Sequence, residues 1–255
     1  MLENVKWSDD GRSFKTNKLT FECSTTKYDG RTSGRQVALL KDRKFLELYE
    51  KILDDQPKRI LEIGFFQAGM PLFLADTINP EKIVAIDQVT DIESLNEVIE
   101  MCGWSNSIKL YGGVDQGDSE AIRTILNGEF GDEPLDLIID DCSHTYDLSK
   151  SVFEATFGYL KPGGKYILED WGWAHWNHKL WQSDESPYKR QPALTNLIFE
   201  SIMALGSAPE IISRVEIPTG YTAIFTRGLN LSFRSSLRLE SIYLTGGCRF
   251  TPLAP

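Results

Sequence analysis

Apolar residues along the chain fall into short continuous runs, and the segments between these runs carry apolar residues at every third or fourth position. Short apolar runs bounded by turn residues are typical of buried strands, and the longer periodic segments are typical of helices. Strands are predicted at 59–63, 82–87, 107–111, 135–140 and 165–168, and helices at 70–77, 92–102, 118–127 and 147–160. This alternation predicts an α/β fold whose sheet is doubly wound and mostly parallel.

The carboxyl-terminal part of the pattern differs from the rest. A helix is predicted near 192–205, and two strands follow at 211–217 and 221–226. A turn as short as Pro218-Thr219-Gly220 joins antiparallel strands, so the sheet is expected to end in an antiparallel hairpin. After Leu229 the residues alternate loosely, and this segment is expected to add an edge strand or a subunit arm.

The amino-terminal part shows no alternation of strand and helix. Residues 1–33 are polar and mixed, which indicates an irregular cap or arm, and 34–55 has the apolar spacing of an amphipathic helix. The predicted organisation is a cap or arm with its helix over 1–56, a ligand-binding catalytic domain over 57–228 and an extension over 229–255.

The composition is that of an ordinary globular protein, with 255 residues of which 41% are hydrophobic and 25% charged. The net charge of −10 argues against affinity for nucleic acid or an anionic membrane surface. No apolar run approaches the roughly 18 residues of a membrane span, and the amino terminus lacks a signal-peptide core, so a cytoplasmic protein is expected. The cysteines indicate neither a disulfide framework nor a zinc site, because no two form a C-x-x-C pair: Cys23, Cys102, Cys142 and Cys248.

Two pairs of adjacent carboxylates mark the ends of the last two parallel strands, Asp140-Asp141 and Glu169-Asp170. A single predicted helix joins these strands, so they are expected to be neighbours whose carboxyl ends share one ligand-binding edge. Carboxylates this close repel one another unless a cation compensates, and oxygen ligands favour a hard divalent ion such as Mg²⁺. Because neighbours along a strand point to opposite faces, Asp141 is the predicted ligand of the first pair and Asp140 suits a structural role. Both acids of the second pair are predicted ligands, since the chain leaves the strand there.

His144 lies three residues after Asp141 and is predicted to face the same pocket. The pKa of an imidazole lies near neutral pH, so this side chain suits a general base. A loop histidine that bonds to the backbone is the alternative. Cys142, between the two, is interpreted as a small residue at a tight strand end rather than a nucleophile.

A glycine turn from Gly64 to Gly69 follows the first parallel strand, and Glu62 lies just before it. A dinucleotide-binding turn has a glycine where this chain has Phe66, whose side chain would obstruct a pyrophosphate. A cofactor without phosphates, such as S-adenosylmethionine, has no such requirement, and Glu62 suits its ammonium group. Tight packing of strand against helix is the alternative explanation of the turn.

Polar side chains also follow the next two strands. Asp87 ends the second strand, where an acid accepts hydrogen bonds from ribose hydroxyls. Asp115 and Gln116 follow the third strand and are predicted to reach the adenine. Three polar strand ends in this order favour a nucleoside cofactor over packing alone.

These motifs resemble those of known enzymes over about 57–228. Glu62-x-Gly64-x-x-x-x-Gly69, Asp87, the acidic fourth strand, Pro162-Gly163-Gly164 and the terminal hairpin resemble class I S-adenosylmethionine-dependent methyltransferases, which have a Rossmann-like sheet. More narrowly, the first turn, Asp140-Asp141-x-Ser143-His144 and Glu169-Asp170 resemble metal-dependent sugar O-methyltransferases of antibiotic biosynthesis, of the mycinamicin and macrocin type, and their cephalosporin-hydroxylase-like relatives. Ala68 and Cys142 stand where that group has glycine, and neither departure removes a functional group.

The resemblance implies a site made of two sets of residues. Magnesium would be bound by Asp141, Glu169 and Asp170, and His144 would deprotonate the acceptor hydroxyl, so Asp141 and His144 are the predicted catalytic residues. The residues expected to contact S-adenosylmethionine are Glu62, Gly64, Gln67, Gly69, Asp87, Asp115, Gln116 and Asp140.

Four of the six tryptophans lie in the eleven residues 171–181, with His175 and His178 among them. Aromatic faces stack on sugar rings, which favours a substrate platform, and packing of a long loop is an equally good explanation. His175 and His178 have the spacing of a helical metal pair, although the acidic site is the better candidate.

The sequence therefore predicts a metal-dependent O-methyltransferase that uses S-adenosylmethionine on a hydroxyl of a sugar or glycosylated natural product. The expected partner is a small hydroxylated acceptor, and the long termini favour a homo-oligomer. An NAD-dependent oxidoreductase on a Rossmann fold and a non-catalytic methyltransferase-like binding protein are the alternatives.

Overall fold

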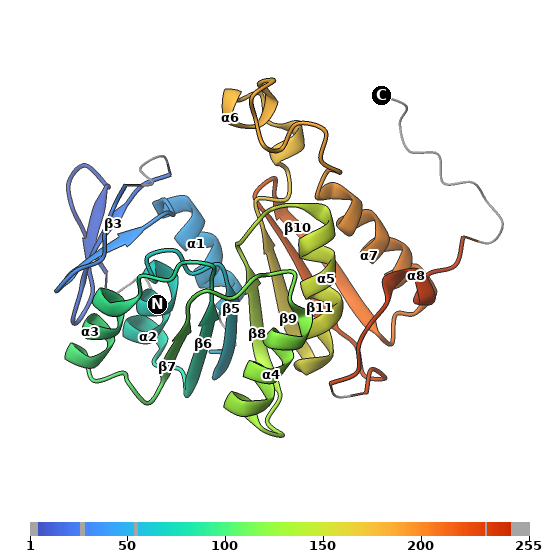
Figure 1. The fold of residues 1–255 in the computed structure, drawn as a ribbon, viewed down its shortest axis with the longest axis horizontal. Coiled ribbons are helices and arrows are strands. Elements are labelled where there is room, and N and C mark those ends of the chain that lie inside the picture. The colour runs from blue at the N-terminus through green and yellow to red at the C-terminus, as the bar shows by residue number, and fades with distance from the viewer. Residues whose placement is uncertain (1–4, 26–28, 54–55, 233, 246–255) are drawn as a thin grey trace. The chain divides into compact units, whose positions relative to one another are not determined.

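The computed structural model describes residues 5–25, 29–53, 56–232 and 234–245, and the chain divides into two compact units, Met1–Leu137 and Ile138–Pro255. The strands form a four-stranded sheet of order β1-β2-β3-β4 and a seven-stranded sheet of order β10-β11-β9-β8-β5-β6-β7 (Figure 1). The large, mostly parallel sheet with its helices confirms the predicted Rossmann-like α/β fold. Each unit is described in turn, and β8 (Leu135–Asp140) crosses the division.

The first unit contains a parallel β/α segment that closely follows the predicted elements. Its strands are β5 (Arg59–Ile63), β6 (Lys82–Ile86) and β7 (Ile108–Tyr111), and its helices are α2 (Gly69–Ile78), α3 (Glu93–Met101) and α4 (Ser119–Phe130). β5 and β6 pair in parallel, as do β6 and β7. Four successive residues of β5 and of β6 are buried, which explains why these strands have continuous apolar runs.

The amino-terminal residues form a small sheet, so the expectation of an irregular segment is wrong, while their role as a cap or arm stays a prediction. The strands are β1 (Lys6–Trp7), β2 (Ser13–Lys15), β3 (Thr20–Cys23) and β4 (Gln36–Leu39). Phe14 and Phe21 stack with ring centroids 4.9 Å apart, and both contact Phe73 of α2 edge-on. These strands of two to four residues carry at most two buried side chains each, which is too short a pattern to recognise by alternation.

The helix predicted over 34–55 is shorter than expected. Val37 and Leu39 are buried in β4, which pairs in parallel with β3. The helix α1 (Arg43–Ile52) begins only after Asp42, whose carboxylate caps it by accepting a hydrogen bond from the Phe45 N–H at 2.9 Å. Val37 and Leu39 are two positions apart, as buried residues of a strand are, and the sequence interpretation wrongly counted them as part of the helix.

The second unit contains the acidic strand ends and the terminal hairpin. After β8 come α5 (Tyr146–Thr156), the short 3-10 helix η3 (Phe157–Tyr159) and β9 (Leu160–Glu169). The 3-10 helix η4 (Trp173–His175), α6 (Lys179–Gln182) and α7 (Thr195–Ser207) lead to β10 (Ile212–Thr219) and β11 (Thr222–Arg227). The two last strands are antiparallel, as predicted, and β11 pairs antiparallel with β9. β9 begins earlier than predicted, at Leu160, so Pro162-Gly163-Gly164 lies within the strand rather than in a turn before it.

The described part of the carboxyl-terminal extension contains the short helix α8 (Leu239–Ile242) and no strand, so the expected edge strand is not formed there. Leu237 and Leu239 donate backbone hydrogen bonds to the main chain and side chain of Glu154 at 3.0 and 2.8 Å. Part of the expected subunit arm and Cys248 lie in 246–255, outside the described residues. Cys23, Cys102 and Cys142 form no disulfide with one another in the described part of the chain. Among the described helices, none has both the length and the apolar character that a bilayer crossing requires.

Candidate functional site

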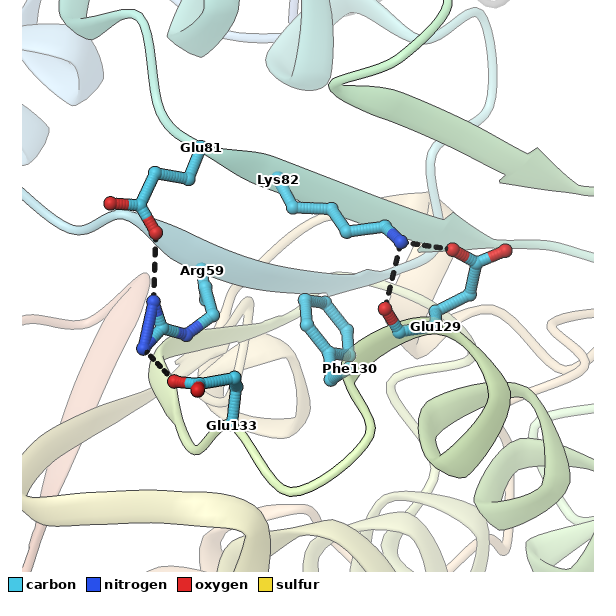
Figure 2. Close-up of a pocket in the computed structure, with 6 residues that line it drawn as sticks. All are labelled: Arg59, Glu81, Lys82, Glu129, Phe130 and Glu133. Atoms are coloured by element: carbon cyan, nitrogen blue, oxygen red, sulfur yellow. Dashed lines mark hydrogen bonds and ion pairs between the residues drawn. The ribbon is translucent and has the colours of Figure 1, made fainter.

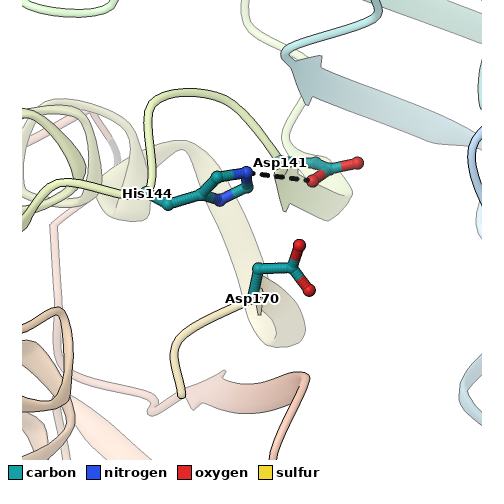
Figure 3. A group of neighbouring side chains, drawn as sticks. All are labelled: Asp141, His144 and Asp170. Carbon is teal, nitrogen blue, oxygen red and sulfur yellow. Dashed lines mark ion pairs between the residues drawn. The ribbon is translucent and has the colours of Figure 1, made fainter. Parts of the chain in front are cut away.

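Three ligating side chains of the second unit converge at the ends of two strands (Figure 3). Asp141 directly follows β8, Asp170 directly follows β9, and His144 lies in the loop before α5. One ligand atom from each residue lies within 4.8 Å of the others, and His144 Nε2 is 3.9 Å from Asp141 Oδ1. The side chains of His144 and Asp141 are 15% and 25% exposed, so an ion or a small molecule can approach them.

The backbone is strained at two of these three residues. His144 has φ of 55° and Asp170 has φ of 52°, in the left-handed region that side chains other than glycine rarely adopt. The Asp170 N–H donates a 2.6 Å hydrogen bond to the carbonyl of Tyr221, which directly precedes β11. Non-glycine residues persist in this conformation where surrounding contacts hold them, and such residues cluster at functional sites.

Asp140 lies on the opposite side of the strand end from its neighbour, in the interior. It is 1% exposed, and the Tyr166 hydroxyl donates a 2.9 Å hydrogen bond to its carboxylate. Burial raises the pKa of Asp140 to about 7, so near neutral pH this side chain carries only part of a negative charge. The repulsion expected among four carboxylates is therefore reduced, and the predicted contact of Asp140 with the cofactor stays a prediction.

Glu169 is also buried, with 2% of its surface exposed, and it pairs with Thr222 of β11 in the sheet. Among the described residues, the cluster of ligating atoms comprises Asp141, Asp170 and His144, and Glu169 is not part of it. Its role as a metal ligand stays a prediction. The position of His144 within the cluster was predicted from its spacing to Asp141.

The glycine turn of the first unit is held by Asp87. Gly64 has φ of 91°, and the non-glycine residues Phe66 and Ala68 have φ of 47° and 56°. Asp87 accepts hydrogen bonds from the backbone N–H groups of Phe66 at 2.7 Å and Val89 at 3.0 Å, one on each oxygen. A carboxylate offers about four acceptor positions, so Asp87 can hold the turn and still accept from a diol.

Gln67 and Gly69 pack against the small amino-terminal sheet. Thr32 donates its backbone N–H to Gln67 Oε1 at 2.9 Å and its hydroxyl to the Gln67 carbonyl at 2.7 Å. A Cβ on Gly69 would lie 2.5 Å from the Ala38 carbonyl oxygen, so close packing alone requires glycine there. The packing interpretation thus accounts for these two residues, and their contact with a cofactor stays a prediction. Thr32 was not identified from the sequence, because a lone threonine far from the turn gives no signal.

The other predicted cofactor residues differ in exposure. Glu62 and Gln116 are each 2% exposed, whereas Asp115 lies on the surface. Asp115 accepts a 2.8 Å hydrogen bond from the Gly117 N–H, which closes the turn before α4. The predicted contacts of Asp115 and Gln116 with adenine, and of Glu62 with the ammonium group, stay predictions.

The tryptophan-rich segment is partly core. Trp173 and Trp181 are 3% and 9% exposed, and their ring centroids lie 5.9 Å apart. The His175 ring contacts the Thr195 hydroxyl at 2.7 Å, and His178 accepts the Leu180 N–H at 3.2 Å. Packing therefore explains the two buried tryptophans, and both histidines are engaged in contacts other than a shared metal.

A cavity of about 390 Å³ lies at the opposite ends of β5 and β6 from the glycine turn (Figure 2). Arg59 begins β5 and forms ion pairs with Glu81 at 2.8 Å and Glu133 at 2.5 Å, while Lys82 begins β6 and pairs with Glu129. Both lining cations thus have acidic partners. We therefore interpret the cavity as part of an ion-pair network and not as a ligand site. The network connects the first residues of β5 and β6 to the end of α4 and the loop after it.

Comparison with known proteins extends the structural description. No family model matches the chain. A stretch of 62 residues is 39% identical to demethylmacrocin O-methyltransferase of Streptomyces fradiae and, equally, to mycinamicin VI 2''-O-methyltransferase of Micromonospora griseorubida. The stretch covers 24% of this chain and 15% of each relative.

Solved structures are similar over a larger part of the chain. The MycE methyltransferase of the mycinamycin pathway, in complex with Mg, SAH and mycinamycin VI, matches with a TM-score of 0.53 and 25% identity, over 72% of this chain and 49% of that one. SAH-bound PaMTH1 of Podospora anserina matches with a TM-score of 0.52 and 18% identity, over 77% of this chain and 80% of that one. The chain therefore has the Rossmann-like fold of these methyltransferases, and it spans about half the length of the MycE chain and less of the curated relatives.

Proposed function

We propose that this chain is an S-adenosylmethionine-dependent and divalent-metal-dependent O-methyltransferase. The observation that carries the proposal is the convergence of Asp141, His144 and Asp170 at the ends of β8 and β9. The likeness to a methyltransferase structure that contains Mg and SAH, at 25% identity, supports the same reaction.

The donor set fits a hard divalent cation. Asp141 and Asp170 offer carboxylate oxygens, and Glu169 lies directly before Asp170 in the chain. Magnesium bound there would stabilise negative charge on an acceptor oxygen and fix its orientation. Asp141 and Asp170 would hold the ion with Glu169, and His144 is kept available for the acceptor.

His144 is suited to remove the proton from the acceptor hydroxyl. Its Nε2 lies 3.9 Å from Asp141 Oδ1, which is beyond hydrogen-bond distance, so this atom is not occupied by that carboxylate. The hydroxyl oxygen would attack the methyl carbon of the sulfonium in a direct displacement, the bond to sulfur would break with loss of S-adenosylhomocysteine, and the proton would pass to Nε2. The cofactor would be held by Glu62, Asp87 and the glycine turn of the first unit.

The proposed acceptor is a hydroxyl of a sugar or of a glycosylated natural product. The relatives named for demethylmacrocin and mycinamicin VI support this class. Oxidoreductase chemistry with NAD is disfavoured, because Phe66 occupies the turn position that a pyrophosphate requires, and its N–H is bonded to Asp87. The cluster of three ligating side chains argues against a non-catalytic binding protein. A homo-oligomer and a cytoplasmic location remain predictions of the sequence.

A methyl-transfer assay tests the proposal. The protein is incubated with S-adenosylmethionine labelled in its methyl group, Mg²⁺ and a panel of glycosylated macrolides, free sugars and catechols. Label should enter a glycoside, and transfer should stop with EDTA and with Asp141→Asn while return of Mg²⁺ rescues only the wild type. Transfer that is indifferent to EDTA and to Asp141→Asn would contradict the metal-dependent mechanism. Absence of label in every acceptor, with cofactor bound, would favour the binding-protein alternative.

A further inference from the structure

Trp173 forms a hydrogen bond with each of the two strained residues of the cluster. Its indole Nε1–H donates to the His144 carbonyl at 2.7 Å, and its backbone N–H donates to the Asp170 carbonyl at 3.3 Å. His144 follows β8 and Asp170 follows β9, so a single residue links the two loops that carry the site.

Both linked residues need support from surrounding contacts. Their φ angles of 55° and 52° lie in the left-handed region, where a side chain at Cβ crowds the backbone. A small change of φ at either residue would turn its side chain away from the shared ligand position. Hydrogen bonds to the carbonyl groups of these residues restrict that rotation.

Trp173 is itself fixed by packing. It is 3% exposed, and its ring lies 5.9 Å from that of Trp181 and 5.0 Å from that of Tyr188. Gln182 of α6 donates to the carbonyl groups of Ala174 at 2.9 Å and Trp176 at 3.1 Å, which ties the turn after Trp173 to the next helix. The Trp181 ring also meets the His144 imidazole edge-on, with centroids 6.4 Å apart.

We propose that Trp173 is a positioning residue that holds the loop of Asp141 and His144 at a fixed distance from the loop of Asp170, and thereby sets the affinity of the cluster for its divalent ion. The inference rests on the proposed function, because it concerns the same site. It assigns a role to the tryptophan-rich segment: Trp173, with Trp181 beside it, supports the site from the interior.

Titration of Mn²⁺ into the Trp173→Phe variant tests the inference without any acceptor. Phenylalanine keeps an aromatic ring against Trp181 and removes the indole N–H. Residues that orient metal ligands from outside the coordination sphere change metal affinity by about 10- to 100-fold, so calorimetry should show Mn²⁺ binding weakened about tenfold. Unchanged affinity in the folded variant would overturn the inference.

Trp171→Phe is the matched control. Trp171 also donates its indole N–H to a backbone carbonyl, that of Thr219 at 3.1 Å, but not to either strained residue. Trp173→Phe alters a buried ring and should lose more stability against urea than Trp171→Phe, and only Trp173→Phe should lose Mn²⁺ affinity. Equal losses of affinity in the two variants would mean that general loosening of the segment, rather than the link to His144, controls the site.

Two further measurements separate this inference from the proposed function. Asp141→Asn should nearly abolish Mn²⁺ binding; if it does not, the metal site itself is wrong, whatever Trp173 does. If Trp173→Phe does not fold, the wild-type protein gives the answer in an ¹⁵N–¹H spectrum of its indole groups. Mg²⁺ should shift the Trp173 indole resonance, and a resonance that stays unmoved while Mg²⁺ binds would overturn the inference.

Discussion

At the scale of single residues, the two acids at the end of β8 differ in burial, and burial changes the charge of one of them. Asp140 is 1% exposed and its pKa is raised to about 7 by burial, whereas the side chain of Asp141 is 25% exposed. Tyr166, itself fully buried, donates to Asp140 and fixes its orientation. Asp140 therefore adds little repulsion when a substrate or ion arrives beside Asp141 and His144.

Tyr166→Phe tests whether the hydrogen bond to buried Asp140 stabilises the fold. The substitution removes one hydrogen-bond donor from a buried carboxyl group while it keeps the ring that packs against Phe153, so we expect a loss of about 1–3 kcal/mol in the free energy of unfolding. Urea denaturation at neutral pH measures the loss. Tyr221→Phe is the control, because the Tyr221 side chain is largely exposed and its change should stay within about 0.5 kcal/mol. A Tyr166→Phe protein as stable as this control would show that the hydroxyl contributes nothing.

At the scale of elements, long apolar runs were predictable and short ones were not. The strands β5, β6 and β8 each bury four successive side chains or more, so composition alone identifies them. The small sheet buries isolated residues such as Phe14 and Val37, and its strands are recognised only once their partners are known. A parallel pairing such as β3 with β4 is set by contacts remote in sequence, which no local pattern encodes.

Thr32→Ala tests how the small sheet supports the glycine turn. Thr32 is 1% exposed; its hydroxyl donates to the Gln67 carbonyl and accepts the Ala38 N–H at 3.2 Å. Loss of both bonds should lower the free energy of unfolding by about 1–3 kcal/mol and weaken S-adenosylmethionine binding, because the turn becomes less ordered. Denaturation and calorimetry measure the two effects, with exposed Thr124→Ala as control. Cofactor affinity that survives Thr32→Ala would show that the turn needs no support from this sheet.

The contact between β7 and α4 predicts a pH dependence in the alkaline range. Tyr111 donates to Glu129, and this hydrogen bond, with burial, raises the pKa of Tyr111 from 10.0 to about 12. The folded protein therefore holds the phenol proton more tightly than the unfolded chain, so the stabilisation is complete below pH 10 and is lost as pH rises towards 12. The difference in unfolding free energy between the wild type and Tyr111→Phe should shrink across this window, in urea melts at several pH values. A constant difference would contradict the assignment.

At the scale of the whole molecule, the sequence predicted which residues gather at strand ends but not how each is oriented. Asp141, His144 and Asp170 were predicted together, since the topology of one β-α-β unit is enough to join them. The burial of Glu169 and the support from Trp173 and Thr32 depend on packing between segments far apart in the sequence. Such contacts are properties of the folded chain, and they decide which predicted side chains converge.

The proposed cofactor and the proposed Mg²⁺ ion are bound by acids from different compact units. Asp87, in the first unit, is the predicted contact of the cofactor, and Asp141, in the second, is a predicted ligand of Mg²⁺. Each ligand should therefore raise the thermal unfolding midpoint independently, and an excess of 100 times the dissociation constant stabilises by about 2.7 kcal/mol. Asp141→Asn should abolish the shift caused by Mg²⁺ and keep the shift caused by S-adenosylhomocysteine, whereas Asp87→Asn should do the reverse. Asparagine at either position keeps the size of the side chain, but Asp87→Asn also loses one of the two backbone hydrogen bonds that hold the glycine turn, so each shift is measured from that variant's own midpoint without ligand. Loss of both shifts in both variants would mean that the two ligands are not bound by separate sets of residues.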